Sequence, residues 1–315
     1  MGTLGTSAAR ADRPARAVDG VIVDGFDAEP LATTAHLAGA VVIPAHDEAA
    51  VIARTLAHLA PLVDAGVEVI VACNGCTDET ADIARRFAGV TVVETAEASK
   101  VAGLNLGDST ATSWPRLYLD ADIEVEPAAV AAAFAALAEP TVLAARPCFG
   151  YDISGASLPV RAYYRARARI AAPTRRMWGA GGYATNEVGH ARFAAFPTLT
   201  ADDCWFDALF AEDEKRVVAT APMRVRTPRD TRTLLGVLMR QHRGHVQQSA
   251  EDAGATGAGR VASLLRAVRG IRDAVDAGWY VGLTVAARVR LALRDTASQT
   301  WERDLSSRGA QGVTA

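Results

Sequence analysis

Lysine is almost absent from this 315-residue chain, in which Lys100 and Lys215 are the only two. The formal net charge of -3 argues against a general nucleic-acid-binding protein, and we expect no nucleic-acid partner. Cysteine is scarce too, and Cys73 and Cys76 form a single CxxC pair. No second pair is present to complete a zinc site. We therefore interpret the two as small apolar residues at a strand end, with a thiol-redox role as the weaker alternative.

Long apolar runs are also missing. Residues 1–20 lack the apolar segment of a secretion signal, and the most apolar stretch, 277–293, contains Arg288 and Arg290. It falls short of the roughly 20 apolar residues that a membrane span needs. We expect a cytoplasmic location, or one at the inner face of the cell membrane. A helix expected over residues 261–271, with arginines on every third position, offers peripheral contact with a membrane as the alternative to packing on the protein itself.

Half of the residues are hydrophobic, and they are arranged in short continuous runs that alternate with helical patterns. Such alternation predicts an α/β fold with a Rossmann-like, mainly parallel sheet flanked by helices. A C-terminal helical extension follows it. The strands are expected at residues 40–43, 67–73, 90–93, 116–119 and 141–145, and the helices at 47–60, 77–87, 100–108, from 127 onward, 158–170, 233–247 and 261–271.

Polar residues gather where three of these strands end, in the segments 46–48, 74–78 and 120–122. Open parallel sheets bind ligands beyond the carboxyl ends of their strands. The three segments are therefore expected to meet at one edge of the sheet and to form a single site.

Asp120 and Asp122 follow a buried strand directly, and in extended geometry residues two apart point the same way. Two carboxylates held this close repel each other unless a cation or a proton lies between them. A hard divalent ion, Mg²⁺ or Mn²⁺, suits such oxygen ligands, and Mg²⁺ commonly binds one or two carboxylates together with substrate phosphates. The pair therefore predicts both a metal and a diphosphate-bearing ligand.

The order of motifs resembles glycosyltransferase family 2. The matching pieces, in chain order, are Val42-Ile43-Pro44-Ala45-His46-Asp47-Glu48, Val71 with Asn74-Gly75-Cys76-Thr77-Asp78, Ser99-Lys100 with Leu104-Asn105, Leu119-Asp120-Ala121-Asp122, Gly181-Gly182 with Ala191-Arg192-Phe193, and Thr200-Ala201-Asp202-Asp203. The resemblance covers about residues 40–245. It implies the GT-A fold and an inverting hexosyltransferase that moves a sugar from UDP or GDP to an acceptor hydroxyl, in the synthesis of polysaccharides or glycoconjugates.

The same resemblance implies roles for individual residues. Asp203 stands where the family places its general base, and Asp202 lies near enough to raise its pKa. Trp178, Gly182 and Asp202 are expected on the acceptor side, which would hold a saccharide, a lipid-linked carrier or a small molecule. Asp120, Asp122 and His242 are the expected metal ligands. The donor-binding residues are Pro44, Ala45, His46, Glu48, Asn74, Asp78, Lys100, Asp120, Ala121, Arg240 and Arg243.

Three departures from the family pattern matter. Cys73-Asn74 replaces two acidic residues, which leaves the choice between uracil and guanine open, because an amide can both accept and donate a hydrogen bond. Asp47 replaces the usual Asn. The segment 241–245 lacks the Arg and Trp of a Gln-x-x-Arg-Trp signature, which weakens a role in processive polysaccharide synthesis.

These features divide the chain into a flexible arm at 1–36, a GT-A catalytic domain at 37–232, a helical segment at 233–300 and a tail at 301–315. Residues 21–23 could add an edge strand. One alternative is a non-catalytic sugar-nucleotide-binding protein on the same fold. Another is a sugar-nucleotide nucleotidyltransferase, although Pro44-Ala45-His46-Asp47 stands where a Gly-rich phosphate loop would be expected.

Overall fold

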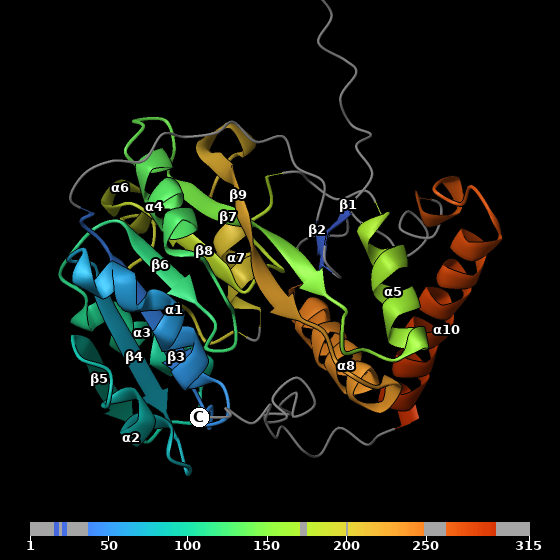
Figure 1. Ribbon diagram of the computed structural model, residues 1–315, viewed down its shortest axis with the longest axis horizontal. Coiled ribbons are helices and arrows are strands. Elements are labelled where there is room, and N and C mark those ends of the chain that lie inside the picture. Colours follow the sequence, from blue (N-terminus) through green and yellow to red (C-terminus); the bar gives the residue numbers. More distant parts are fainter. Residues whose placement is uncertain are drawn as a thin grey trace, which may run out of the picture.

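The computed structural model of the chain describes residues 16–18, 21–23, 37–170, 175–199, 201–248 and 263–293. In this part, nine strands form one sheet, with helices on both faces (Figure 1). The strands are β1 Arg16–Val18, β2 Val21–Val23, β3 Ala40–Ala45, β4 Glu68–Asn74, β5 Val90–Thr95, β6 Arg116–Leu119, β7 Ala144–Asp152, β8 Gly182–Thr185 and β9 Lys215–Arg226. The helices are α1 Ile52–Asp64, α2 Thr80–Ala84, α3 Lys100–Thr110, α4 Pro127–Ala136, α5 Leu158–Ala168, α6 Glu187–His190, α7 Asp202–Ala208, α8 Thr231–Gln248 and α10 Ile271–Leu293.

The strand order is β1-β2-β7-β8-β6-β3-β4-β5, and β9 pairs with β7. Strands β6, β3, β4 and β5 are parallel neighbours, and β8 lies antiparallel between β6 and β7. The predicted α/β class and mainly parallel sheet are confirmed. The carboxyl ends of β3, β4 and β6 therefore lie at the same edge, as expected for the three polar segments.

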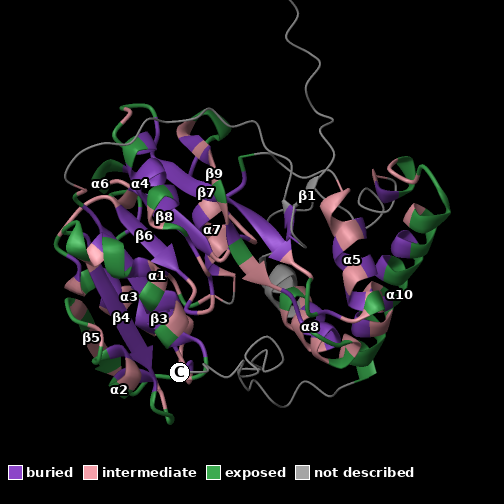
Figure 2. Cartoon of the chain, viewed as in Figure 1, coloured by how far each residue is buried: buried purple, intermediate pink, exposed green. Residues whose placement is uncertain are grey.

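Alternate residues of the central strands face two separate apolar clusters. Val41 and Ile43 pack in the cluster that contains α1 and α4, whereas Val42 packs in the cluster of α3 and the aromatic residues of α7. Both faces of β3 are thus buried, which explains its uninterrupted apolar sequence. Figure 2 shows the central strands as buried from end to end.

Several boundaries differ from the expected ones. Helix α1 begins at Ile52 instead of Asp47, because Asp47 adopts a left-handed backbone conformation with φ +49° that ends regular structure. The strand expected at 141–145 is β7, which runs to Asp152, and neither β8 nor β9 was predicted. Of the helix expected at 261–271, residues 263–266 are helical and 267–270 separate them from α10.

Helices α5, α8 and α10 form a separate layer beyond β7 (Figure 1). Helix α10 is fixed to α5 by a stacked pair, Tyr163 and Tyr280, with ring centroids 4.9 Å apart. The buried carboxylate of Asp276 also lies 2.6 Å from the guanidinium of Arg165. In the residues described, no helix combines the length and apolar character needed to cross a membrane. Most of the expected arm, the segment 249–262 and the expected tail lie outside the described residues.

Candidate active site at the carboxyl edge of the sheet

The loops after β3 and β4 are joined at the sheet edge. His46 Nδ1 lies 2.6 Å from the carbonyl oxygen of Asn74, and the Glu48 amide donates to the Thr80 hydroxyl at 2.6 Å. The amide of Ala49 donates to Asp78 Oδ2 at 3.1 Å. The two loops that were expected to hold the nucleoside therefore form one continuous wall.

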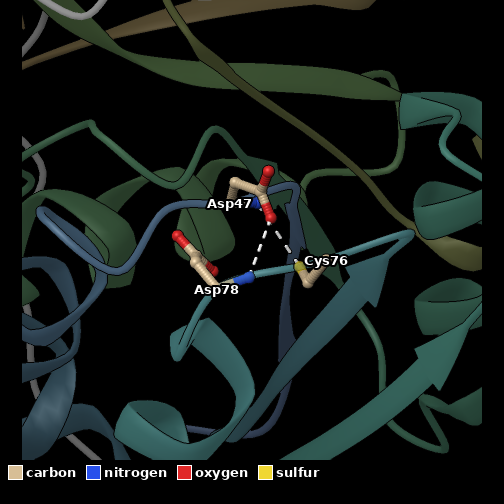
Figure 3. A group of neighbouring side chains, drawn as sticks. All are labelled: Asp47, Cys76 and Asp78. Carbon is tan, nitrogen blue, oxygen red and sulfur yellow. Dashed lines mark hydrogen bonds between the residues drawn. The ribbon is translucent and has the colours of Figure 1, made fainter.

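Asp47 holds these loops together (Figure 3). Its carboxylate accepts hydrogen bonds from the amides of Thr77 at 2.5 Å and Asp78 at 3.2 Å, and its own amide donates to Cys76 Sγ at 3.4 Å. The thiol of Cys76 donates to the Ala45 carbonyl at 3.3 Å. Asp and Asn tolerate left-handed backbone better than most residues, so Asp47 can take the place of the family's Asn here.

Asn74 lies at the end of β4 with 1% of its surface exposed, and neither polar atom of its amide has a hydrogen-bond partner among the described residues. Its Oδ1 abuts Gly103 of α3 so closely that a Cβ at that glycine would lie 2.8 Å away. Leaving a buried amide unpaired costs about 1–3 kcal/mol, so such a group is suited to a polar ligand.

The backbone around Asp120 and Asp122 is held from two sides. The amide of Asp120 donates to the Gly181 carbonyl at 2.8 Å, and the Thr55 hydroxyl of α1 donates to the Ala121 carbonyl at 2.6 Å. Gly181 has φ +71°, and a Cβ there would lie 2.5 Å from the Ile123 side chain and 3.5 Å from Asp120 Oδ2. A glycine is therefore required beside the acidic pair.

Lys100, the first residue of α3, lies between two carboxylates. Its Nζ is 2.8 Å from Asp120 Oδ1 and 3.0 Å from Asp202 Oδ2, and the Tyr183 hydroxyl donates to the same Asp202 oxygen at 2.7 Å. Burial, together with Asp202 and Asp122, raises the pKa of Asp120 to about 6 even though Lys100 opposes the shift. Burial alone would lower the pKa of Lys100, but Asp120 and Asp202 outweigh it and raise that pKa.

Asp203 lies in the first turn of α7. Its carboxylate accepts hydrogen bonds from the amides of Gly179 at 2.7 Å and Cys204 at 2.8 Å. Burial raises the pKa of Asp203, and the neighbouring Asp202 adds to the shift, whereas Lys100 and the two amides counteract it. One turn further along, Asp207 accepts the Met177 amide at 2.7 Å, so α7 fixes the backbone of residues 177–179 at two points.

The residues expected on the acceptor side lie in different environments. Trp178 is half-buried under the guanidinium of Arg176, which lies 4.8 Å from its ring centroid. Gly182 is buried in β8, where a Cβ would lie 3.0 Å from Leu119 and 3.2 Å from Met223. Asp202 is 5% exposed, and one of its carboxylate oxygens is engaged by Lys100 and Tyr183.

The basic segment lies on α8, where Arg240 and His242 are half-buried and Arg243 is placed by its backbone alone. Among the residues described, one group of three His, Cys, Asp or Glu side chains lies close enough to share an ion. It consists of Asp47, Cys76 and Asp78, which the loop hydrogen bonds already occupy. The metal assignment to Asp120, Asp122 and His242 stays a prediction, as do the donor and acceptor roles.

Sequence reasoning missed several residues that shape this site. Gly103 lies against Asn74 Oδ1, and Gly181, noted only as part of a motif, accepts the amide of Asp120. Asn105, noted as part of a motif, exchanges two hydrogen bonds with the backbone of Phe196, donating at 3.0 Å and accepting at 2.8 Å.

Residues 40–186 match the family model described as glycosyl transferase family 2. This match covers just under half of the chain, and it makes that segment similar to family 2 glycosyltransferases. The matched region contains the loops 45–48 and 74–78, Lys100, and the Asp120–Asp122 pair, so the sequence-based resemblance is confirmed. Asp203 and α8 lie beyond it. No curated protein gives a significant match.

Among the solved structures that resemble this chain, one supports the fold. The mannosyltransferase PcManGT from Pyrobaculum calidifontis, in complex with GDP-Man and Mn²⁺, is 20% identical with a TM-score of 0.58 over 85% of this chain and 90% of its own. The mannosyl-3-phosphoglycerate synthase of Rubrobacter xylanophilus is 16% identical over 70% and 78%, with a TM-score of 0.48. S. aureus TarS in complex with UDP is 14% identical over 78% and 70%, with a TM-score of 0.47. The first of these supports the GT-A fold, and the two weaker likenesses add nothing to it.

Proposed function

We propose that this glycosyltransferase moves a hexose from a UDP- or GDP-sugar to an acceptor hydroxyl with inversion at the anomeric carbon. The observation that carries the proposal is the position of Lys100 between Asp120 and Asp202. This contact brings the acidic pair at the end of β6 and the α7 carboxylates into one site. A donor diphosphate at the acidic pair would therefore lie near an acceptor hydroxyl at the α7 carboxylates.

The residues at the end of β6 fit a divalent ion. Asp120 and Asp122 offer carboxylate oxygens, and the pKa of Asp120 is raised to about 6, first by desolvation and then by the charges of Asp202 and Asp122. Mg²⁺ and Mn²⁺ favour such oxygen ligands. When bound, the ion would neutralise charge on the leaving diphosphate. Lys100 offers a second cation to the same phosphates, and Arg240, Arg243 and His242 of α8 are proposed to complete the basic wall.

The nucleoside is proposed to lie along the joined loops, against His46, Glu48 and Asp78, with its base facing the unpaired amide of Asn74. An amide can pair with the O–C–N–H edge of either uracil or guanine. Both bases therefore remain candidates, and the experiment below separates them.

Asp203 is proposed to take the proton from the acceptor hydroxyl as that oxygen attacks the anomeric carbon. Each carboxylate oxygen has two lone-pair positions, so the amides of Gly179 and Cys204 leave acceptor capacity free. The raised pKa makes Asp203 a stronger base than an ordinary aspartate. Trp178, on the segment bound by Asp203, is placed to stack on an acceptor sugar.

A thermal-shift panel of UDP and GDP, each with and without Mn²⁺, tests the donor assignment. We expect one nucleotide to raise the melting temperature only when Mn²⁺ is present, and Asp122→Ala to abolish that shift. Asp82→Ala, at an exposed residue of α2, removes one negative charge as well and should keep the Mn²⁺-dependent thermal shift. If neither UDP nor GDP gives a Mn²⁺-dependent thermal shift, the donor assignment is wrong.

The second candidate, a sugar-nucleotide-binding protein without catalysis, predicts the same thermal shifts. Incubation with UDP- or GDP-hexoses and a panel of saccharide and lipid-linked acceptors separates the two, because only the enzyme releases the nucleoside diphosphate faster with an acceptor than without one. The C-terminal helices favour a membrane-borne acceptor, because α10 carries an exposed apolar face.

A further inference from the structure

The outer face of α10 is apolar along its whole length. Ile271, Val275, Trp279, Val281, Val285, Val289 and Leu293 are between 38% and 86% exposed. Ile271, Val275, Val285, Val289 and Leu293, with Gly278 and Gly282 between them, recur every three or four positions and so form one stripe. The opposite side of the helix holds Tyr280 and Asp276 against α5, so the stripe faces away from the protein (Figure 1).

A groove continues this face toward the preceding helical turn. It has a volume of about 400 Å³ and lies between Leu264, Leu265 and Val268 on one side and Ala277, Gly278 and Val281 on the other. All of these lining residues are apolar or glycine. The stripe and the groove together make an apolar surface larger than scattered exposed side chains would produce.

The charges around this surface have one sign. Between residues 274 and 287, each exposed side chain is apolar or glycine. Exposed arginines stand at both ends: Arg266, Arg269 and Arg272 before this stretch, and Arg288 and Arg290 after it. The two acidic residues of 263–293 are turned to α5, where Asp273 pairs with Arg169 and Asp276 with Arg165.

We propose that α10 lies flat on an anionic lipid bilayer, with its apolar stripe in the acyl boundary and its terminal arginines among the headgroups. Helices with an apolar face, an aromatic residue and cationic flanks bind membrane interfaces in this way. The position differs from the one expected from sequence, because the apolar face belongs to α10 and not to a helix over 261–271.

Two other occupants fit less well. The chain's own segments 249–262 and 294–315 contain Val261, Trp301, Leu305 and Val313 as their only large apolar residues, too few to cover the stripe. A second copy of the chain would bring its five arginines against the same five, and like charges oppose such a contact. We do not propose a membrane span, since α10 is long enough but not apolar enough to cross a membrane.

Co-sedimentation of the full chain with vesicles tests the proposal. We expect binding to vesicles of equal parts phosphatidylglycerol and phosphatidylcholine, and weak binding to phosphatidylcholine alone. Added salt should release the protein, because the headgroup attraction is screened. Emission from Trp279 should shift to shorter wavelength on binding, and Trp279→Phe should remove that shift.

Val285→Asp places a charge at the centre of the stripe and should lower the vesicle partition coefficient by about tenfold or more. Val188→Asp, at a valine of α6 that is 66% exposed, is the matched control and should bind as the wild type does. Circular dichroism confirms that both variants are folded, and Val289→Asp replaces Val285→Asp if the latter is not.

The proposal is overturned if the wild type stays in the supernatant with anionic vesicles, or if Val285→Asp and Val188→Asp bind equally. A stable dimer in sedimentation velocity that Val285→Asp dissociates, without vesicle binding by the wild type, assigns the face to a second copy instead. Nucleotide-dependent thermal shifts are unaffected by either result, so failure here leaves the proposed reaction standing.

Discussion

The ammonium group of Lys100 lies 2.8 Å from Oδ1 of Asp120, so the first carboxylate of the acidic pair is already paired with a cation inside the protein. Replacing Lys100 with Met leaves Asp120 and Asp202 facing each other without that cation. We expect Lys100→Met to weaken binding of the metal–nucleotide complex by at least about tenfold, because Lys100 is also proposed to bind the donor phosphates. Isothermal titration with the preferred nucleoside diphosphate and Mn²⁺ measures this loss.

Lys215→Met is the matched control, since Lys215 is the other lysine and pairs with Asp207 at 3.1 Å. Breaking a buried ion pair by removing one partner costs about 3–5 kcal/mol, so both variants should melt at lower temperature. Lys215→Met should nevertheless bind nucleotide as the wild type does. Equal loss of affinity in the two variants would show that Lys100 acts through stability alone.

Asp203→Asn should keep nucleotide binding and slow sugar transfer by about 10²–10⁴-fold, because the amide cannot accept the acceptor proton. Steady-state release of the nucleoside diphosphate measures the rate. The raised pKa of Asp203 also predicts that kcat falls as the pH drops through a value above the roughly 3.9 of a free aspartate, since the base must be ionised.

Asp207→Asn serves as the comparison for Asp203, because Asp207 holds the Met177 amide from the next turn of α7. Asp207→Asn should lower the melting temperature but should leave the fall of kcat at low pH unchanged. Turnover at the wild-type rate in Asp203→Asn would remove Asp203 as the base.

Gly103→Ala should disturb Asn74, because the added methyl group would lie 2.8 Å from Asn74 Oδ1 and 3.1 Å from Pro44 Cβ. We expect weaker nucleotide binding and altered preference between UDP and GDP, measured by thermal shift. Gly236→Ala on α8 is the control, since nothing lies within 4 Å of its added methyl group. It should be neutral or stabilising by up to about 1 kcal/mol. Wild-type nucleotide selectivity in Gly103→Ala would argue against base contact by Asn74.

Asp108 connects α3 to the strand that carries the acidic pair, and its removal should alter stability in a pH-dependent way. Its carboxylate accepts from Arg116 at 2.8 Å and Tyr118 at 2.5 Å and lies 2.8 Å from His190 Nε2. Burial opposes ionisation of Asp108, but these three partners outweigh it and lower its pKa. The resulting stability is fully present above about pH 4 and is lost as the pH falls through the lowered value.

We therefore expect Asp108→Asn to cost about 2–4 kcal/mol near neutral pH. The difference in melting temperature between Asp108→Asn and the wild type should become smaller below about pH 4, because Asp108 of the wild type then also becomes protonated and loses its charge. Thermal unfolding of both proteins above and below about pH 4 measures this difference. Asp82→Asn, at an exposed aspartate, is the control. A gap that stays constant into acid would contradict the assigned role.

The first half of the fold was predictable because its chemistry is local. Strands β3 and β4 are buried on both faces and read as continuous apolar runs, and polar residues mark their carboxyl ends. Strand β8 has only four residues, and β9 contains Pro222 and several charged residues, so neither is a continuous apolar run. The place of both strands in the sheet depends on partners distant in sequence.

The same distinction holds in the site. The residues of the β3, β4 and β6 loops follow from motifs, but the contact between Lys100 and Asp202 joins positions 102 apart and has no local pattern. In the sequence, Asp47 looks like any aspartate at the start of a helix. Its left-handed conformation and the loop contacts that follow from it could therefore not be predicted.

The attachment of residues 177–179 to α7 has a consequence for changing what this glycosyltransferase accepts. Asp203 and Asp207 accept the amides on either side of Trp178, so two hydrogen bonds join this segment to the helix that carries the proposed base. Grafting a loop from another glycosyltransferase to recruit a different acceptor would detach the base unless α7 were transplanted with it. If the proposed roles of Trp178 and Asp203 hold, loop and helix would have to be exchanged together to change acceptor selectivity.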